Sequence, residues 1–197
     1  MLQPFHREPA VSPSAMKRFD PIPIILFAPA GLLGTTLYAA DYMTPGEAQR
    51  ILFPDATGFE AKPVAPTREQ IQAIQDRLKA RWDATQWGLY AAKKDDDVLG
   101  YVLTDAVIGK SLFINYAVGF SKDGAIKGVE ILSYRETHGG EVRQNAWRKQ
   151  FVGKSLSSPL RLGDDIRNIS GATLSCAHLT EGVRRLATFV ALALPRE

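Results

Sequence analysis

The 197-residue sequence is short of the residues that most metal and redox centres need, with a single cysteine and three histidines. Cys176 has no partner for an internal disulfide. No Cys-x-x-Cys-His or Cys-His cluster offers ligands for haem, an iron–sulfur cluster or zinc. His138 and His178 lie outside any recognised nucleophile motif. We therefore expect no metal centre and no acid–base dyad, and we predict that Cys176 is a small packing residue.

An excess of one charge is also missing. Lys and Arg together number 24 against 21 Asp and Glu, and the basic residues are scattered along the chain. A nucleic-acid interface needs basic residues gathered on one surface, so we do not expect nucleic acid as a partner. Three adjacent carboxylates at residues 95–97 could suggest a metal site, but this run is more typical of a solvated turn. The 45% hydrophobic content suffices for one core of ordinary size.

The amino-terminal region has the pattern of an export signal. Residues 1–15 are polar and rich in proline, and Lys17 and Arg18 then precede an apolar run over residues 21–38 that ends in small residues at 39 and 40. This order predicts a secretory signal peptide. An uncleaved membrane anchor is the alternative, because about 18 residues of low polarity approach the length of a membrane span. Either reading places the rest of the chain in the periplasm or at the outer face of the cytoplasmic membrane.

Capping residues and hydrophobic spacing predict the helices. Thr44 and Pro45 open a short helix that stops at Pro54, and Thr67 opens a stronger helix with Gln70 as its capping-box partner. The proline-rich residues between them, 54–66, are predicted to form a loop. Further helices are expected at 143–151 and 173–194, the latter with Leu174 in its apolar stripe and with Arg184 and Arg185 on its opposite side.

Alternating segments predict four strands, at residues 87–93, 99–108, 112–121 and 125–134. Tight turns join them, so the sheet is expected to be antiparallel, with Tyr116, Val118 and Phe120 on one face. Helices flanking an antiparallel sheet define an α+β fold. The predicted organisation is a start and signal at 1–40, a helical extension at 41–84 and a single domain at 85–197.

One polar turn leads directly into the last helix. The hydroxyl groups of Ser170, Thr173 and Ser175 lie near the expected start of that helix. A helix amino terminus presents free N–H groups and a positive dipole end, which suit an anion, and Gly171 with Ala172 leaves room for a phosphate group. The alternative is that Ser170 or Thr173 only caps the helix.

The segment Ser-Gly-Ala-Thr-Leu-Ser at 170–175 resembles the acceptor signature of the FMN-binding domain family, found in subunits of the sodium-pumping NADH:quinone reductase and the Rnf complex. In that family the threonine, here Thr173, carries FMN through a phosphoester bond installed by an FAD:protein FMN transferase. Residues 136–141 (Glu-Thr-His-Gly-Gly-Glu), followed by Trp147, Phe151 and Gly153-Lys154, resemble the family's Glu-Thr-Pro-Gly-Leu-Gly loop. We expect Trp147 and Phe151 to be core residues.

The resemblance covers roughly residues 85–194 and differs from the family at two positions. His138 stands where the family has proline, and Arg167 stands where it usually has aspartate. The resemblance implies an exported electron carrier with covalent FMN and a membrane redox partner, rather than an enzyme with a substrate of its own. A flavin needs no protein acid, base or metal for electron exchange. The implied cofactor-binding residues are Thr173, Ser170, Gly171, Ala172, Ser175, Glu136, Thr137, His138, Gly139 and Arg167.

Two other functions remain open from the sequence. The surface formed by residues 136–141 and 170–175 could instead belong to a non-catalytic binding module for an envelope ligand or partner. It could also belong to a flavin reductase that exchanges FMN freely. Covalent attachment of the flavin separates the carrier from both alternatives.

Overall fold

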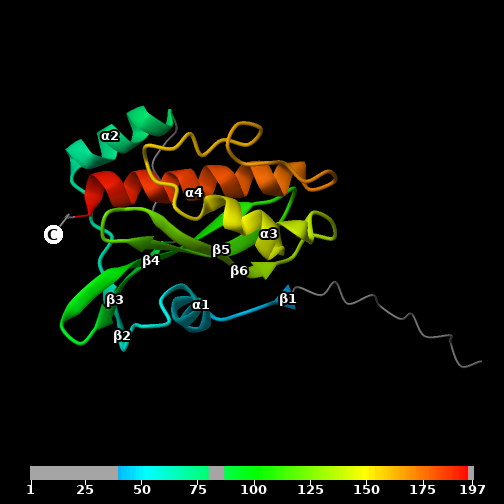
Figure 1. Ribbon diagram of the computed structural model, residues 1–197. Coiled ribbons are helices and arrows are strands. Elements are labelled where there is room, and N and C mark those ends of the chain that lie inside the picture. Colours follow the sequence, from blue (N-terminus) through cyan, green and yellow to red (C-terminus); the bar gives the residue numbers. More distant parts are fainter. Residues whose placement is uncertain (1–39, 80–86, 195–197) are drawn as a thin grey trace, which may run out of the picture. The chain divides into compact units, whose positions relative to one another are not determined.

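The computed structural model describes residues 40–79 and 87–194, and Figure 1 shows them in colour. Residues 1–39 of the predicted start and signal, and residues 80–84 of the predicted helical extension, lie outside these residues. Six strands form one antiparallel sheet in the order β1-β6-β5-β4-β3-β2. The strands are β1 (Ala40–Asp41), β2 (Gly58–Lys62), β3 (Gly88–Lys94), β4 (Asp97–Ile108), β5 (Phe113–Ser121) and β6 (Ile126–Tyr134).

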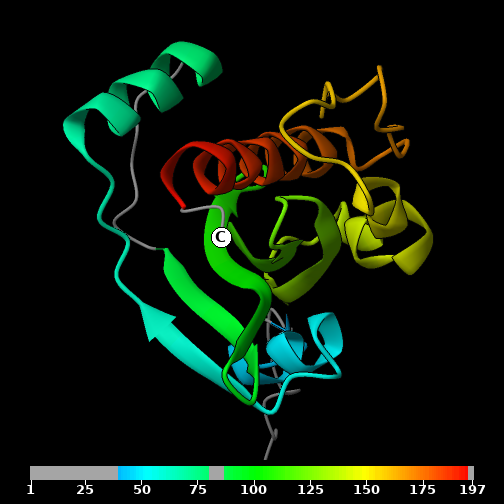
Figure 2. The ribbon, with the colours of Figure 1, turned by 60° about the vertical axis from the view of Figure 1, so that its left-hand side comes forward.

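Helices cover both faces of this sheet. The longest, α4 (Thr173–Ala193), packs on β4 and β5, and α2 (Arg68–Leu78) packs against α4. The short helix α1 (Pro45–Leu52) packs on the opposite face, where it contacts β5 and β6. Figure 2 shows α4 and α2 on one side of the sheet and α1 on the other. The α+β prediction is therefore confirmed, including its four central strands.

Side-chain alternation divides the interior into two cores. Tyr116, Val118 and Phe120 are fully buried in the larger core beneath α4, as predicted. Ala117 points to the other face and joins Leu52 in the smaller core beneath α1. The carboxylate turn at 95–97 is exposed, as expected for a solvated hairpin.

The capping box predicted at Thr67 and Gln70 is present, and the predicted helix start at Thr44 also has a capping box, which was not predicted. The Thr44 hydroxyl accepts from the backbone N–H of Glu47, whose carboxylate accepts from the Thr44 N–H. Thr67 and Gln70 make the same reciprocal pair at the start of α2. Such a box satisfies two N–H groups that a helix start otherwise leaves unpaired. Among the described residues, no helix is both long enough and apolar enough to cross a bilayer.

Two predictions of local structure are wrong. Residues 54–66 contain β2, which pairs with β3 over its whole length as an edge strand. The expected helix at 143–151 is broken into a 3₁₀ turn at Gly140–Arg143, a four-residue helix α3 (Asn145–Arg148) and a second 3₁₀ turn at Lys149–Phe151. The residues directly after this segment bind the free edge of β6. The Lys154 carbonyl oxygen accepts from the Ile126 N–H, and the Gly153 N–H donates to the Ile126 carbonyl oxygen.

Arg148 closes the same edge further along. Its guanidinium donates to the carbonyl oxygen of Val129 at 2.6 Å and pairs with the carboxylate of Glu130. An unpaired sheet edge invites pairing with another chain, so this cover removes one such edge.

The prediction for Arg185 is also wrong. Arg185 does not turn away from the apolar side of α4, because its Nη2 reaches Oδ2 of Asp105 on β4 at 2.5 Å. Tyr116 donates its hydroxyl to the same oxygen at 2.7 Å. Burial, and then the Asp105 charge, raise the pKa of Tyr116 well above its ordinary value, which keeps Tyr116 a donor. The close approach of α4 to this group requires Gly182, since an added Cβ would lie 2.3 Å from the Tyr116 hydroxyl.

Candidate functional site

The loop after β6 meets the first turn of α4. Tyr134 at the end of β6 donates its hydroxyl to the carbonyl oxygen of His138 at 2.5 Å. Its oxygen also lies 2.9 Å from Oγ of Ser175. Because the single Tyr134 proton is directed to His138, Ser175 is the donor in the second bond. Ser175 is buried, so it joins the two segments rather than lining an open surface.

Gly139 lies at the centre of this junction. Its φ of 86° is in the left-handed region, which glycine adopts without strain. A Cβ at this position would come within 2.6 Å of the Tyr134 hydroxyl and 2.8 Å of Ser175 Oγ. The loop can approach α4 this closely only with glycine at position 139.

A cavity of about 660 Å³ opens where the loop faces the turn before α4. Its volume lies within the range of ordinary small-molecule sites. The structure therefore brings the two sequence motifs to one place. The lining residues are Thr137, His138, Gly139, Gly140, Glu141, Arg143, Gln144 and Gly171.

Thr173 is the first residue of α4 and is exposed. Its hydroxyl accepts a hydrogen bond from Nδ2 of Asn168 at 2.9 Å. The alternative, that Ser170 or Thr173 only caps the helix, is wrong, because the N-cap is Ala172, which gives no side-chain capping bond. The N–H groups of the first turn therefore remain available to an anion. Gly171 has open space around the position of a Cβ.

Tertiary contacts fix the backbone that leads to Thr173. The indole Nε1 of Trp147 donates to the carbonyl oxygen of Arg167 at 2.7 Å, and the Arg167 N–H donates to Oε1 of Gln150 at 2.8 Å. Trp147 and Phe151 are buried and meet edge to face, which confirms them as core residues. Arg167 itself is exposed.

Asp165, two residues before Arg167, has a structural role. Its Oδ1 accepts from the backbone N–H of Arg161 at 2.9 Å, and its Oδ2 pairs with Nζ of Lys154 at 2.9 Å. Burial raises the pKa of Asp165, but the Arg161 N–H and Lys154 outweigh it and leave a net lowering. Asp165 therefore ties the turn before the acceptor segment to the cover of β6.

Glu136 points away from the cavity toward the turn between β4 and β5. Its Oε1 accepts from the N–H of Ser111 and, at 2.7 Å, from that of Leu112. These two backbone bonds hold the pKa of Glu136 below its ordinary value. His178 binds the same turn, with Nδ1 2.6 Å from the carbonyl oxygen of Ile108 and 2.8 Å from that of Gly109. Since both partners are acceptors, Nδ1 must carry the proton.

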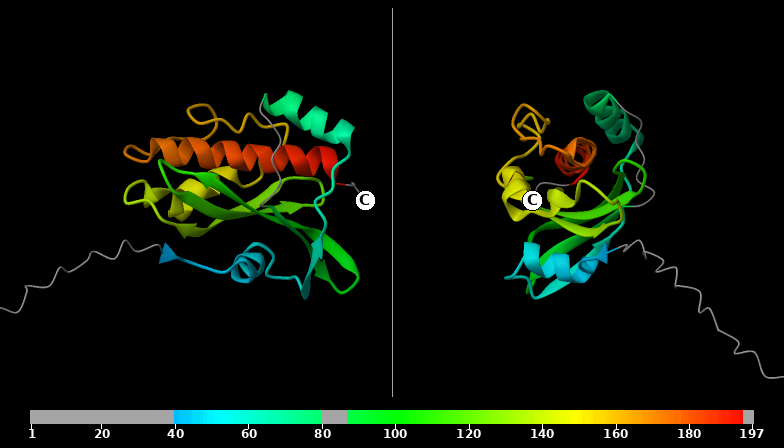
Figure 3. Two further views of the ribbon diagram at one scale, coloured as in Figure 1. Left: turned by 180° about the vertical axis from the view of Figure 1, so that it is seen from behind. Right: turned by 90° about the vertical axis from the view of Figure 1, so that its right-hand side faces the viewer.

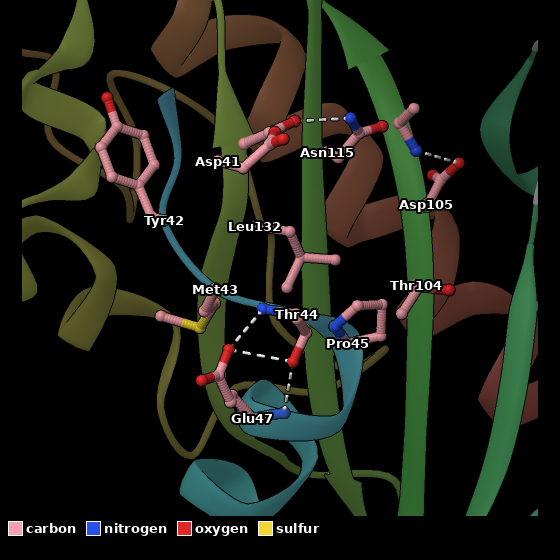
Figure 4. Close-up of a pocket in the computed structure, with 12 residues that line it drawn as sticks. Asp41, Tyr42, Met43, Thr44, Pro45, Glu47, Thr104, Asp105, Asn115 and Leu132 are labelled. Carbon is pink, nitrogen blue, oxygen red and sulfur yellow. Dashed lines mark hydrogen bonds between the residues drawn. The ribbon is translucent and has the colours of Figure 1, made fainter. Parts of the chain in front are cut away.

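A second cavity, of about 560 Å³, lies on the α1 face of the sheet and was not predicted (Figure 4). Asn115 and Ser133 form its polar floor, with Nδ2 of Asn115 donating to the Ser133 hydroxyl at 2.6 Å. Glu47 at its margin is already engaged in the Thr44 capping box. This cavity is separated from Thr173 by the sheet, and the acceptor motif contributes no residue to it.

The part of the chain that the structure describes contains no group of His, Cys, Asp and Glu suited to a metal ion. Cys176 is fully buried, and burial raises the pKa of its thiol. A buried protonated thiol is a poor nucleophile.

Residues 109–188 match the model of the FMN-binding domain, and both sequence motifs fall in this range. The chain thus contains an FMN-binding domain similar to those of Rnf complex subunits, as the motifs indicated. It is 26% identical over 181 residues to a subunit of the Na(+)-translocating ferredoxin:NAD(+) oxidoreductase complex of Acetobacterium woodii, covering 81% of this chain and 86% of that relative. It is 31% identical over 114 residues to a subunit of the ion-translocating oxidoreductase complex of Erwinia tasmaniensis, covering 52% of this chain and 54% of that protein.

Sequence reasoning missed three residues that shape the site. Asn168 positions the Thr173 hydroxyl, and its place five residues earlier carries no recognised signal. Tyr134 joins the loop to α4 but reads from the sequence as an ordinary strand residue. Arg143 lines the cavity and stacks its guanidinium 4.2 Å from the centre of the Tyr42 ring.

Proposed function

We propose that this chain is an exported electron-transfer subunit that carries FMN on Thr173 through a phosphoester bond. Its partners would be an FAD:protein FMN transferase and a membrane-bound redox protein. The relatives described above are subunits of ion-translocating oxidoreductase complexes, which supports a role in an assembly of that kind. The observation that carries the proposal is the exposed Thr173 hydroxyl at an uncapped helix start beside a cavity of ligand size.

The residues around Thr173 fit a phosphoester in three respects. Ala172 leaves the first-turn N–H groups without a side-chain cap, so they can receive phosphate oxygens. Open space at Gly171 leaves room for the phosphate. Asn168 donates to the threonine oxygen and fixes its direction toward solvent, where a transferase can reach it.

The loop after β6 fits the ring portion of the same group. Thr137, His138 and Gly139 expose polar and backbone groups along the cavity, and Tyr134 holds this loop against α4. FMN supplies the electron exchange when it is bound, while the loop positions and shelters it. Glu136 contributes indirectly, because its carboxylate is engaged by the β4–β5 turn.

Arg167 is an exposed cation six residues before Thr173 on the acceptor segment. Its backbone is held on both sides by Trp147 and Gln150, while its side chain is exposed. A guanidinium suits phosphate oxygens, and a charge-assisted hydrogen bond contributes about 1.5 to 3 kcal/mol when sheltered and less when exposed. We assign Arg167 to holding the attached phosphate.

The test is the intact mass of the full chain co-produced with an FAD:protein FMN transferase in a host that exports it. The parent should gain the mass of one FMN less one water and keep its flavin fluorescence on a denaturing gel. Thr173→Ala should lose both, Thr173→Ser should keep part of the modification, and Thr137→Ala should remain modified. A fluorescent Thr173→Ala band, or a parent that releases all its FMN on unfolding, would overturn the covalent assignment.

Export is tested separately. A reporter that is active only in the cytoplasm, fused after Glu197, should be inactive. An active fusion would place the domain on the wrong side of the membrane for this proposal.

A further inference from the structure

A guanidinium group lies beside the loop that is proposed to hold the flavin ring. Among the described residues that line the cavity there, Arg143 is the only lysine or arginine. Its Nε donates to the carbonyl oxygen of Gly140 at 3.1 Å, and a Cβ added to Gly140 would lie 3.6 Å from the same nitrogen. The guanidinium is therefore folded back against the loop after β6.

The amino-terminal strand holds this guanidinium from its other side. Tyr42 directly follows β1, and its N–H donates to the carbonyl oxygen of Leu132 on β6 at 2.8 Å. Figures 1 and 3 show β1, α3 and the start of α4 at the same end of the sheet. The Tyr42 ring extends away from Leu132 and Asn115 (Figure 4), and Cζ of Arg143 lies over it, 4.2 Å from the ring centre. A cation is attracted to an aromatic face, so Tyr42 restrains Arg143.

The charge of Arg143 is not neutralised by a carboxylate. Arg148 pairs with Glu130, whereas no carboxylate in residues 40–79 and 87–194 forms an ion pair with Arg143. The Arg143 backbone is also fixed, because Nε of Arg148 donates to its carbonyl oxygen at 3.0 Å. A cation that is already in place can stabilise a negative charge beside it without reorganisation.

We propose that Arg143 stabilises the reduced form of the flavin and that Tyr42 is the positioning residue that holds Arg143 at the cavity. The reduced isoalloxazine, formed by uptake of two electrons from the redox partner and one proton from water, carries a negative charge that the oxidised ring lacks. A cation beside the ring favours the reduced form and therefore raises the midpoint potential. The inference rests on the proposed function, because it requires FMN in this cavity.

Salt provides a first check of this electrostatic effect. Arg143 is exposed, so its interaction with a charged ring is screened as ionic strength rises. The potential of the parent should therefore approach that of Arg143→Gln at high salt. A difference between the two that is independent of salt would contradict an effect of charge.

The experiment uses full chains that intact mass shows to carry FMN, and it measures their midpoint potentials by redox titration at one pH. Arg143→Gln should have a lower potential than the parent, and Arg143→Lys should keep most of the parent's value. Tyr42→Leu changes no charge but should also lower the potential, whereas Tyr42→Phe keeps the ring and should match the parent. The double variant Tyr42→Leu/Arg143→Gln should match Arg143→Gln, because Tyr42 acts through Arg143.

Arg135→Gln is the matched control for charge. Arg135 follows β6 directly, is exposed and lies 3.7 Å from Asp41, but it does not line the cavity. An equal fall in potential in Arg135→Gln, or no fall in Arg143→Gln, would overturn the role of Arg143. A Tyr42→Leu variant that loses unfolding free energy but keeps the parent's potential would show that Tyr42 is only structural.

Failure of the proposed function gives a different result. If the parent carries no covalent FMN but binds it reversibly, the covalent assignment fails. The inference is then tested by the ratio of dissociation constants for oxidised and reduced FMN, which Arg143→Gln should lower several-fold. A covalently modified parent whose potential is unaffected by Arg143→Gln would instead retain the proposed function and refute the inference. A parent that binds no FMN would refute both.

Discussion

The hydroxyl oxygens of Tyr134 and Ser175 lie 2.9 Å apart, and this contact joins the loop after β6 to the first turn of α4. Tyr134→Phe leaves the buried Ser175 hydroxyl and the His138 carbonyl without this partner. We expect a loss of about 1 to 3 kcal/mol in unfolding free energy, measured by denaturant titration. Tyr90→Phe on β3 is the control and should change stability little. Equal stabilities of Tyr134→Phe and the parent would mean that the contact contributes nothing.

Alanine substitutions at Gly139 and Gly163 distinguish the effect of a steric clash on stability from the effect of backbone strain. Both have positive φ, 86° and 83°, so alanine at either position carries a left-handed penalty of about 1 to 2 kcal/mol. Only at 139 would the new Cβ meet neighbouring atoms, since nothing lies within 4 Å at 163. We expect Gly139→Ala to be less stable than Gly163→Ala by a further 1 to 3 kcal/mol or so. Thermal and denaturant unfolding of the pair measure this, and equal losses would contradict the close contact.

Neighbouring arginines on α4 should differ sharply. Arg185→Met leaves the Asp105 carboxylate, which is 3% exposed, without its cation. Loss of one partner of a buried pair costs about 3 to 5 kcal/mol, and we expect the lower end because the Arg185 side chain is 26% exposed. Arg184→Met removes only a surface pair with Glu181 and should cost about 1 kcal/mol or less. Similar losses in both variants would show that the Asp105 contact is not buried in solution.

Glu136 should contribute a pH-dependent part of stability. Its pKa is lower in the folded protein than the ordinary 4.5, so its contribution is complete above that value and disappears as pH falls through the folded pKa. Glu136→Gln should therefore differ from the parent at neutral pH and converge with it in acid. Amide hydrogen exchange at Ser111 and Leu112 should accelerate in the variant. Glu141→Gln is the control, and a Glu136→Gln difference that persists unchanged into acid would exclude this role.

Arg167 and Asp165 are predicted to act differently on flavin attachment. Arg167→Asp should leave the unfolding free energy unchanged, because the backbone bonds to Trp147 and Gln150 remain, but should shift the flavin potential or the attachment rate. Asp165→Ala should destabilise the turn that it ties to Lys154. Time-resolved intact mass and redox titration measure the first effect. If Arg167→Asp matches the parent in rate and potential, Arg167 is only a tolerated departure from the family.

Local signals allowed most of the fold to be predicted. Thr44, Thr67 and the alternating strands act within a few residues, so their patterns are readable in the sequence. The edge strand β2 was missed because its pairing with β3, some thirty residues later, decides its conformation. Arg185 was misplaced for the same reason, since Asp105 lies 80 positions away in the chain.

The site was predictable as two motifs but not as a geometry. The resemblance indicated that the loop at 136–141 and the segment at 170–175 act together. One cavity is lined by residues 137–141 of the loop and by Gly171 of the segment. Nothing local indicated that the Glu136 carboxylate turns toward Ser111 and Leu112, or that Asn168 positions Thr173. These contacts depend on strand register and on the packing of α4, which a single sequence does not display.

The hold of Trp147 and Gln150 on Arg167 has a consequence for quality control of the protein. The segment that presents Thr173 takes its shape from residues about twenty positions earlier, so an excised peptide would not reproduce it. A transferase that reads this shape would modify folded chains and pass over unfolded ones. In that case the covalent flavin content of a preparation would report the fraction of chains that had folded when the transferase met them.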